Sequence, residues 1–212
     1  MKWEREHMEN ESCDEPDFEL PDVLIVNTAL ETVRSEFSAK YRKAPPGHPP
    51  PTYVPHLIEV GSILAAHNYS PFVVAAGLLH DLVEEIPSWS YDRMRTEFGK
   101  EVALLVRFVT HPDSSLPWEH KWRKYVQLVG RGPRDVRAIA CADKISNIRA
   151  TIPFLKKAVP LQSYLSRGWR FHSEKLWELE RLFPNRVHPH LYATFLAALE
   201  EFDRLGRRSE LR

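Results

Sequence analysis

The sequence predicts an all-α fold, a helical bundle built around one buried central helix. After residue 20, no segment shows the period-two alternation of apolar and polar residues that marks a strand. Apolar side chains recur instead at spacings of three and four residues, and the stretch from Phe72 to Val83 is apolar on all sides, which is typical of an enclosed helix. With 212 residues, 43% of them hydrophobic, the chain can bury a full core, and we expect a single domain over residues 21–205.

Composition and charge narrow the range of partners. The formal net charge is zero, so nothing global points to nucleic acid or to an anionic membrane surface. Two cysteines are too few for a disulfide framework, which favours a reducing compartment. The N-terminus lacks the apolar segment of a signal peptide, and no apolar run reaches the roughly 18 residues of a membrane span. We therefore expect a cytoplasmic protein with no nucleic-acid or membrane partner, and the oligomeric state stays open.

The first elements are an acidic tail, a helix and a loop. Residues 1–20 carry many acidic and few apolar side chains, a composition that favours a flexible tail. A helix is expected from Asp22 to about Lys40, and the proline-rich stretch Tyr41–Thr52 then breaks regular structure. Arg42 and Lys43 directly precede the prolines. They are candidates for binding a phosphate, but cations near a helix C-terminus are also favoured by the helix dipole alone.

The next two helices carry the first candidate site residues. A helix over residues 55–68 places His56 on its inward face, and Pro71 then opens the central helix. At 100° per residue, the ionisable side chains of the central helix fall within an arc of about 140°. These are His80, Asp81, Glu84 and Glu85. Buried charges cost several kcal/mol unless they are paired, hydrogen-bonded or bound to a metal, so something must compensate them.

The second half of the chain is predicted to be helical as well. The expected helices cover residues 88–98, 100–110, 118–129, 135–150, 164–183 and 188–205, and residues 206–212 form a basic, frayed end. His111 and His120 flank a loop and are expected to face solvent. Asp143 lies in the apolar run of the helix over 135–150, and Asn147 shares its face four residues later.

Four of these residues form a credible metal site. His56, His80, Asp81 and Asp143 supply two imidazoles and two carboxylates from three inward-facing helices. Such a mixed nitrogen and oxygen set suits Mn²⁺, Fe²⁺ or Zn²⁺ better than Ca²⁺, and the ligand set alone does not choose among them. A cation there lowers the pKa of a bound water and stabilises charge on a phosphoryl oxygen.

The same residues carry a resemblance to a known family. His56 in Pro-His, the pair His80-Asp81 in Leu-Leu-His-Asp-Leu-Val-Glu-Glu, and Asp143 in Ala-Asp-Lys-Ile-Ser-Asn-Ile-Arg resemble the HD-domain phosphohydrolases. More narrowly, they resemble the hydrolase domain of the RelA/SpoT family and the free-standing small alarmone hydrolases, which remove the 3′-pyrophosphate of ppGpp and pppGpp. The resemblance covers about residues 22–183.

The resemblance implies a role for each matching residue. The metal ligands would be His56, His80, Asp81 and Asp143, with Mn²⁺ as the ion. Glu84 and Glu85 would replace the Glu-Asp pair that orients the attacking water, and Arg42, Lys43 and Asn147 would contact the nucleotide. Two departures stand out: Glu85 is one methylene longer than the usual Asp, and the proline-rich stretch Ala44–Thr52 replaces the family's usual stretch at the lip of the pocket.

Two other functions stay open at this point. A different HD phosphohydrolase would remove a phosphate from NADPH or another nucleotide, and Glu84 would serve there equally well. A non-catalytic module would bind an alarmone or a partner protein as a regulator, and its sequence would be expected to lack a metal ligand. A role in neutralising a nucleotide-modifying toxin leaves no sign in a sequence.

Overall fold

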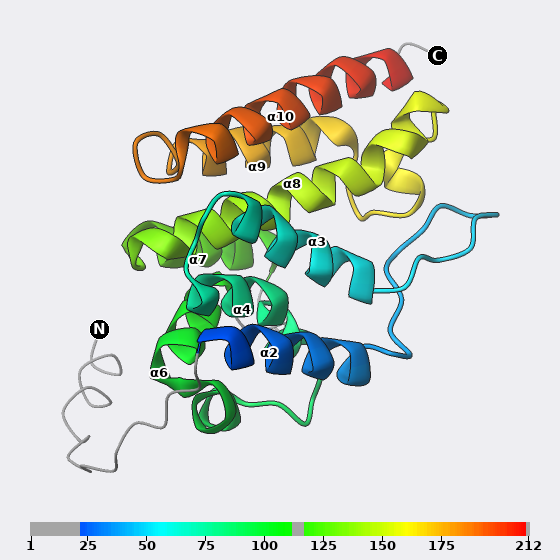
Figure 1. Cartoon of the computed structure of the whole chain (residues 1–212). Helices are drawn as coiled ribbons and strands as arrows, with labels where there is room; N and C mark the ends of the chain where they lie inside the picture. The colour runs from blue at the N-terminus through cyan, green and yellow to red at the C-terminus, as the bar shows by residue number, and fades with distance from the viewer. Residues whose placement is uncertain (1–21, 112–116, 211–212) are drawn as a thin grey trace.

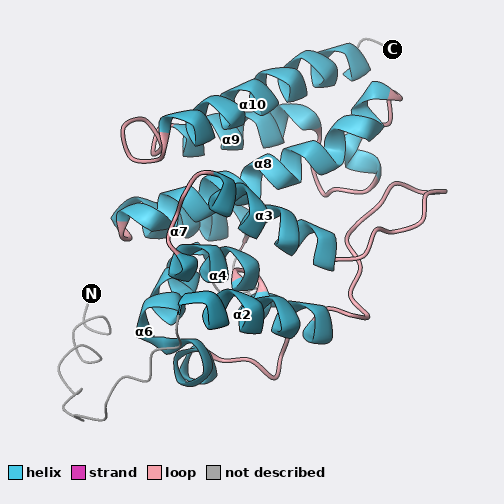
Figure 2. Cartoon of the chain, in the orientation of Figure 1, coloured by secondary structure: helices cyan, strands magenta, loops and turns pink. Residues whose placement is uncertain are grey.

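The computed structural model describes residues 22–111 and 117–210, and within them the secondary structure is helical (Figures 1 and 2). The expectation of an all-α fold is confirmed. The helices are α2 (Asp22–Glu36), α3 (Val54–Ala66), α4 (Pro71–Leu79), α5 (Leu82–Glu85), α6 (Tyr91–Val109), α7 (Trp118–Arg131), α8 (Arg134–Lys156), the 3-10 turn η1 (Leu161–Ser163), α9 (Trp169–Glu180) and α10 (Pro189–Glu210). The predicted acidic tail, residues 1–20, lies outside the described residues.

Helix α4 is the centre of the fold. Every residue from Val73 to Leu79 is buried, and the helix packs against α2, α3, α6 and α8. Ser70 caps its start by accepting a hydrogen bond from the Val73 amide at 3.4 Å, and Pro71 occupies a first-turn position where no amide donor is needed. The expected central, buried helix is therefore confirmed.

The central helix is nevertheless shorter than the sequence predicts. It ends at Leu79, and the chain passes through a turn at His80 and Asp81 before the single turn of α5. The assumption that four ionisable side chains share one side of a continuous helix was therefore wrong. Glu84 and Glu85 lie in this separate turn and have different partners, His111 and Lys40.

Close packing of α3 on α4 depends on Gly77. A Cβ atom added there would lie 2.3 Å from Leu64 Cδ1, so Gly77→Ala should overpack this contact. We expect a loss of about 1–3 kcal/mol of unfolding free energy, partly offset by the better helix propensity of alanine, which chemical denaturation would measure. The control is Gly130→Ala in α7, where a Cβ meets Leu182 at an ordinary 3.7 Å. Equal stability of the two variants would contradict the predicted overpacking.

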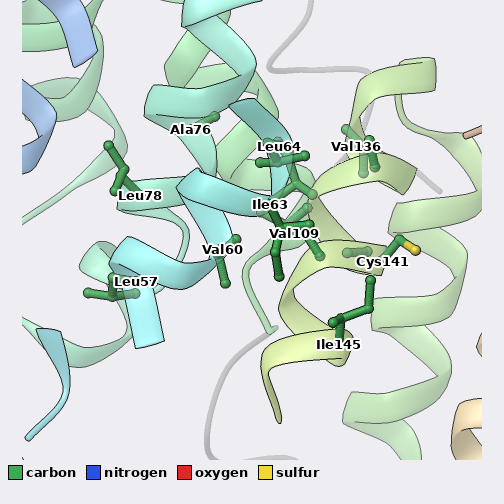
Figure 3. Close-up of a cluster of buried hydrophobic side chains, with 14 of the residues drawn as sticks. Leu57, Val60, Ile63, Leu64, Ala76, Leu78, Val109, Val136, Cys141 and Ile145 are labelled. Carbon is green, nitrogen blue, oxygen red and sulfur yellow. The ribbon is translucent and has the colours of Figure 1, made fainter. Parts of the chain in front are cut away.

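The helices stack on both sides of α8. In Figure 1, α9 and α10 lie on one side of α8, whereas α3 and then α4 and α2 lie on its other side. Helix α8 packs extensively on both α10 and α3. Apolar side chains from α3, α4, α6 and α8 fill the space where these helices meet, among them Leu64, Val109 and Ile145 (Figure 3). None of the described helices combines the length and apolar character that a bilayer crossing requires.

Helix boundaries differ from the predicted ones mainly in the C-terminal half. Gly99 interrupts α6 with φ of 83°, as its glycine predicted, but α8 continues through Pro153 to Lys156 rather than ending near residue 150. Helix α10 continues beyond the predicted domain end at residue 205. The segment predicted to fray is helical to Glu210. Within it, Gly206 packs against the Trp169 ring so closely that an added Cβ would come within 2.7 Å.

The proline-rich loop between α2 and α3 is closed at its base by backbone pairing. The Arg42 amide donates to the Pro51 carbonyl at 2.8 Å, and the Tyr53 amide donates to the Lys40 carbonyl at 3.0 Å. An isolated antiparallel bridge joins Tyr41 and Thr52 between them. In Figure 1 the loop extends away from the helices, while its two ends stay beside α2 and α3. This pairing holds Arg42 and Tyr53 next to each other.

Candidate metal centre and adjoining cavity

Donor atoms from three parts of the chain converge in the interior. His56 comes from α3, Asp143 from α8, and His80 with Asp81 from the turn after α4. One donor atom each of His56, His80 and Asp143 lies within 4.8 Å of the others, and all three residues are buried. Helix packing therefore brings together the side chains that the sequence marks as charges in apolar runs.

Asp81 completes the cluster. Its two carboxylate oxygens lie 3.3 Å from His80 Nε2 and 3.7 Å from His56 Nε2. Asp143 Oδ1 lies 3.5 Å from His56 Nε2 and 3.6 Å from His80 Nε2. Both imidazoles thus direct the same ring nitrogen toward the same two carboxylates. His56, His80 and Asp143 bring donor atoms close enough to share one cation, and Asp81 lies beside them with one oxygen toward each imidazole.

The hydrogen bonding of His80 leaves one of its ring nitrogens without a partner, which suits a metal ligand. His80 Nδ1 lies 2.8 Å from the Gly77 carbonyl, which only accepts, so Nδ1 carries the proton. In the neutral ring Nε2 then carries the lone pair, and it is a buried atom without a hydrogen-bond partner. A buried polar atom in this state is costly unless something binds it. A divalent cation among these donors would satisfy it.

The electrostatics of the cluster also call for positive charge. Burial alone would lower the pKa of His80, but the charges of Asp81 and Asp143 against its ring raise it to about 10. Burial lowers the pKa of His56. The pKa of both aspartates is held below the ordinary value despite burial, by His80 beside Asp81 and by Lys144 beside Asp143. The cluster therefore attracts a cation, either a proton or a metal ion.

A second layer of side chains orients the two carboxylates. The Tyr53 hydroxyl donates to Asp81 Oδ2 at 2.7 Å. Lys144 Nζ donates to Asp143 Oδ2 and Asn147 Nδ2 donates to Asp143 Oδ1, each at 2.6 Å. Asp143 thus keeps its oxygens in a defined direction whatever occupies the centre.

Lys144 is a site residue that the sequence interpretation missed. Burial alone would lower its pKa, but the charge of Asp143 raises it, so the ammonium stays protonated. Its Nζ lies 5.0 Å from the centre of the buried Tyr125 ring. A lysine next to the aspartate in an apolar run was the available signal, since a buried ammonium needs a partner as much as a buried carboxylate does.

Glu84 and Glu85 face different surroundings. Glu85 Oε2 lies 3.4 Å from Lys40 Nζ, at the end of the segment after α2. Glu84 Oε2 accepts a hydrogen bond from the His111 amide at 3.3 Å. Neighbouring protein desolvates the Glu84 carboxyl and Asp81 adds negative charge, and together they raise its pKa to about 7. The Glu84 side chain is exposed and does not line the cavity described below, and a carboxyl with this pKa is a candidate to exchange a proton near neutral pH.

His111 is not the solvent-facing loop residue that the sequence suggested, whereas His120 is exposed. The His111 ring stacks on Tyr125 with centroids 4.2 Å apart. Its burial and the charge of Lys144 lower its pKa to about 4, so the ring is neutral at pH 7. Packing of α7 against the end of α6 explains the difference, because periodicity does not show which aromatic ring covers a loop end.

The three residues predicted to contact a nucleotide lie together. Arg42 Nη2 donates to Asn147 Oδ1, and the guanidinium lies 5.9 Å from the centre of the Tyr53 ring. Because Asn147 also donates to Asp143, it links Arg42 to the metal cluster. Arg42, Lys43 and Asn147 all line one cavity.

This cavity has a volume of about 520 Å³ and adjoins the cluster. Lys144 and Asn147, which bond to Asp143, form part of its wall together with Glu85. Its wall also combines aromatic rings with cations. The aromatic members are Tyr41, Tyr53, Trp118, Trp122, Phe154, Tyr164 and Phe202, and the cationic ones are Arg42, Lys43, Lys144 and Lys175. Aromatic faces and ammonium or guanidinium groups suit a ligand with a ring and phosphate groups.

Comparison with known proteins agrees with this architecture. Residues 36–128 match the family model described as HD domain. The chain is 32% identical over 170 residues to a Streptomyces coelicolor protein named GTP pyrophosphokinase, which is 74% of this chain and 20% of that protein. It is 29% identical over 152 residues to the Haemophilus influenzae guanosine-3′,5′-bis(diphosphate) 3′-pyrophosphohydrolase, which is 66% of this chain and 22% of that protein. The chain thus spans about a fifth of the length of these relatives.

A solved structure has the same fold. It is described as a metazoan ortholog of SpoT that hydrolyses ppGpp, and it aligns with a TM-score of 0.60 at 23% identity over 89% of this chain and 97% of that one. The matched region of the family model contains His56, His80 and Asp81, and Asp143 follows it on α8. The likeness in fold therefore extends over nearly the whole of both chains.

Proposed function

We propose that this chain, which carries an HD domain, hydrolyses the 3′-pyrophosphate of ppGpp and pppGpp to GDP or GTP and pyrophosphate. One observation carries the proposal: two imidazoles and two carboxylates converge beside a cavity lined by cations and aromatic rings. The relatives named as pyrophosphohydrolases support the choice of reaction. The substrate is a small nucleotide held outside the buried cluster.

In this proposal His56, His80, Asp81 and Asp143 hold one divalent cation. Mn²⁺ is the ion we expect, and Zn²⁺ or Fe²⁺ fits the same mixed donor set. When bound, such an ion lowers the pKa of a coordinated water and stabilises charge on a phosphoryl oxygen. The orphaned Nε2 of His80 and the two carboxylates that face it support the assignment.

The protein's own groups position the reactants. Glu84 removes a proton from the attacking water, whose oxygen forms a bond to the phosphorus next to the ribose. The bond from that phosphorus to the 3′-oxygen breaks, and the 3′-oxygen takes the proton that Glu84 accepted, so that GDP or GTP and pyrophosphate are released. Glu85, paired with Lys40, is the second water-orienting carboxylate. Arg42, Lys43 and Asn147 contact the nucleotide, and Lys144 adds positive charge next to Asp143.

A nucleotide panel tests the reaction. With Mn²⁺, the purified protein should release pyrophosphate from ppGpp and pppGpp, and a chelator should stop the release because the cluster then lacks its cation. The panel includes NADPH and a 5′-nucleotide, assayed for phosphate and pyrophosphate separately. Release of phosphate alone from those compounds would replace the proposed substrate with another nucleotide. Mn²⁺ and alarmone binding without any hydrolysis would indicate a regulatory module.

A further inference from the structure

The orientation of His56 depends on a chain of side chains behind the cluster. His56 Nδ1 lies 2.9 Å from the Ser146 hydroxyl oxygen, on the side of the ring opposite the carboxylates. Ser146 lies three residues after Asp143 on α8, and its side chain is buried, with 1% of the residue exposed. The Ser146 hydroxyl in turn donates to Glu59 Oε2 at 2.6 Å, and Glu59 follows His56 on α3. These hydrogen bonds thus join α3, which carries His56, to α8, which carries Asp143.

The direction of these hydrogen bonds follows from the groups themselves. A carboxylate only accepts, so the single hydroxyl proton of Ser146 goes to Glu59. Toward His56 the Ser146 oxygen then has only lone pairs, and His56 Nδ1 must supply the proton. The other ring nitrogen, Nε2, is left with the lone pair that faces Asp81 and Asp143.

Glu59 also forms an ion pair at the protein surface. Its second oxygen, Oε1, accepts from Arg149 Nη1 at 3.1 Å, and both side chains of this ion pair are partly exposed. The series of hydrogen bonds that starts at His56 therefore ends at the protein surface, at the pair of Glu59 and Arg149. His80 reaches the same tautomer without such a chain, because its Nδ1 donates directly to the Gly77 carbonyl.

We propose that Ser146 and Glu59 are positioning residues that fix the tautomer of His56 and so prepare it to bind the cation. This inference rests on the metal site of the proposed function. An imidazole without a fixed partner distributes its proton between its two nitrogens, and the molecules with the proton on Nε2 offer no lone pair at the centre. Outer partners of this kind typically contribute 10- to 100-fold to metal affinity.

The test measures Mn²⁺ binding and the tautomer of His56 in the full chain. Ser146→Ala should raise the Mn²⁺ dissociation constant about 10- to 100-fold, measured from free Mn²⁺ by electron paramagnetic resonance. In the metal-free protein, nitrogen-15 NMR of the His56 ring should find the proton on Nδ1 in the wild type. In Ser146→Ala the proton should be shared with Nε2. Glu59→Ala, at a partly exposed position, should weaken binding in the same direction.

Arg149→Ala is the matched control. It removes the surface ion pair with Glu59 and leaves the bonds to Ser146 and His56, so Mn²⁺ affinity should change less than twofold. Circular dichroism checks that each variant is folded. Mn²⁺ affinity within twofold of the wild type in Ser146→Ala, or a wild-type His56 protonated on Nε2, would overturn the inference. These readouts need no nucleotide, so failure of the proposed hydrolysis is seen separately, in the pyrophosphate assay.

Discussion

Replacing His80 with alanine should lower Mn²⁺-dependent pyrophosphate release by at least about a thousandfold. A cation in the cluster is expected to supply several kcal/mol of transition-state stabilisation, and about 4 kcal/mol corresponds to that factor. His80 Nε2 is buried without a hydrogen-bond partner and lies 3.3 Å from Asp81, so no neighbouring side chain replaces it. Asp81→Ala should have a comparable effect. Initial rates and bound Mn²⁺ per chain are measured together.

His67→Ala is the control for the His80 replacement. His67 follows α3, and its Nδ1 lies 2.7 Å from the Ile63 carbonyl rather than toward the carboxylates, so rate and Mn²⁺ content should stay near the wild-type values. Hydrolysis that survives both His80→Ala and Asp81→Ala would reject the cluster as the reaction centre. Loss of activity with full Mn²⁺ content would place these residues in another role.

Replacing Glu84 with glutamine should lower kcat/KM about 100- to 10,000-fold and should also change its pH dependence. A general base works when deprotonated, so the wild-type rate should rise with pH and level off above about 7, where Glu84 has lost its proton. A cation beside Asp81 offsets one of the charges that raise this pKa, so the midpoint with Mn²⁺ should lie at or below 7. Glutamine binds no proton in this range, and the rising limb should disappear.

The same raised pKa has a consequence for stability. Between the ordinary glutamate pKa of 4.5 and about 7, the folded protein keeps a proton on Glu84 that an unfolded chain has already lost. Stability therefore falls as pH rises through this range, and the Glu84 carboxylate opposes folding above it. Glu84→Gln should accordingly leave Tm at pH 8 unchanged or higher, measured by thermal unfolding. A lower Tm would mean that lost activity reflects a damaged fold.

Glu97→Gln is the control for the Glu84 replacement. Glu97 lies on α6 and pairs with Arg93 at 2.7 Å on the surface, away from the cluster. Its replacement should leave both the rate and the pH profile unchanged. A wild-type profile without a rising limb, or a limb that persists in Glu84→Gln, would contradict the role of Glu84 as base.

The sequence was sufficient to predict which charges would gather. His56, His80, Asp81 and Asp143 each lie in an apolar helical pattern, and burying charges separately costs too much, so the prediction that they meet follows from desolvation. The structure brings them together, and their role as metal ligands stays a prediction. All-helical architecture followed likewise from the spacing of apolar residues.

Other parts of the site depend on packing that periodicity does not contain. The turn at His80 and Asp81 looks helical in sequence, because no proline or glycine marks it. Which partners Lys144, Ser146 and His111 find depends on how α8 meets α3 and α7. The partner of Glu85 could not be predicted from the sequence either. Lys40 lies 45 residues earlier and comes close to Glu85 only because α2 packs on α4.

Backbone pairing at the base of the proline-rich loop allows the loop and the metal cluster to vary independently. Backbone bonds from Arg42 to Pro51 and from Tyr53 to Lys40 anchor the loop beside the cluster, independently of the side chains between them. Insertions or deletions between residues 43 and 51 can therefore remodel the rim without displacing Tyr53 from Asp81. Changes at the rim can therefore alter the ligands that the cavity accepts while the hydrogen bond from Tyr53 to Asp81 is kept.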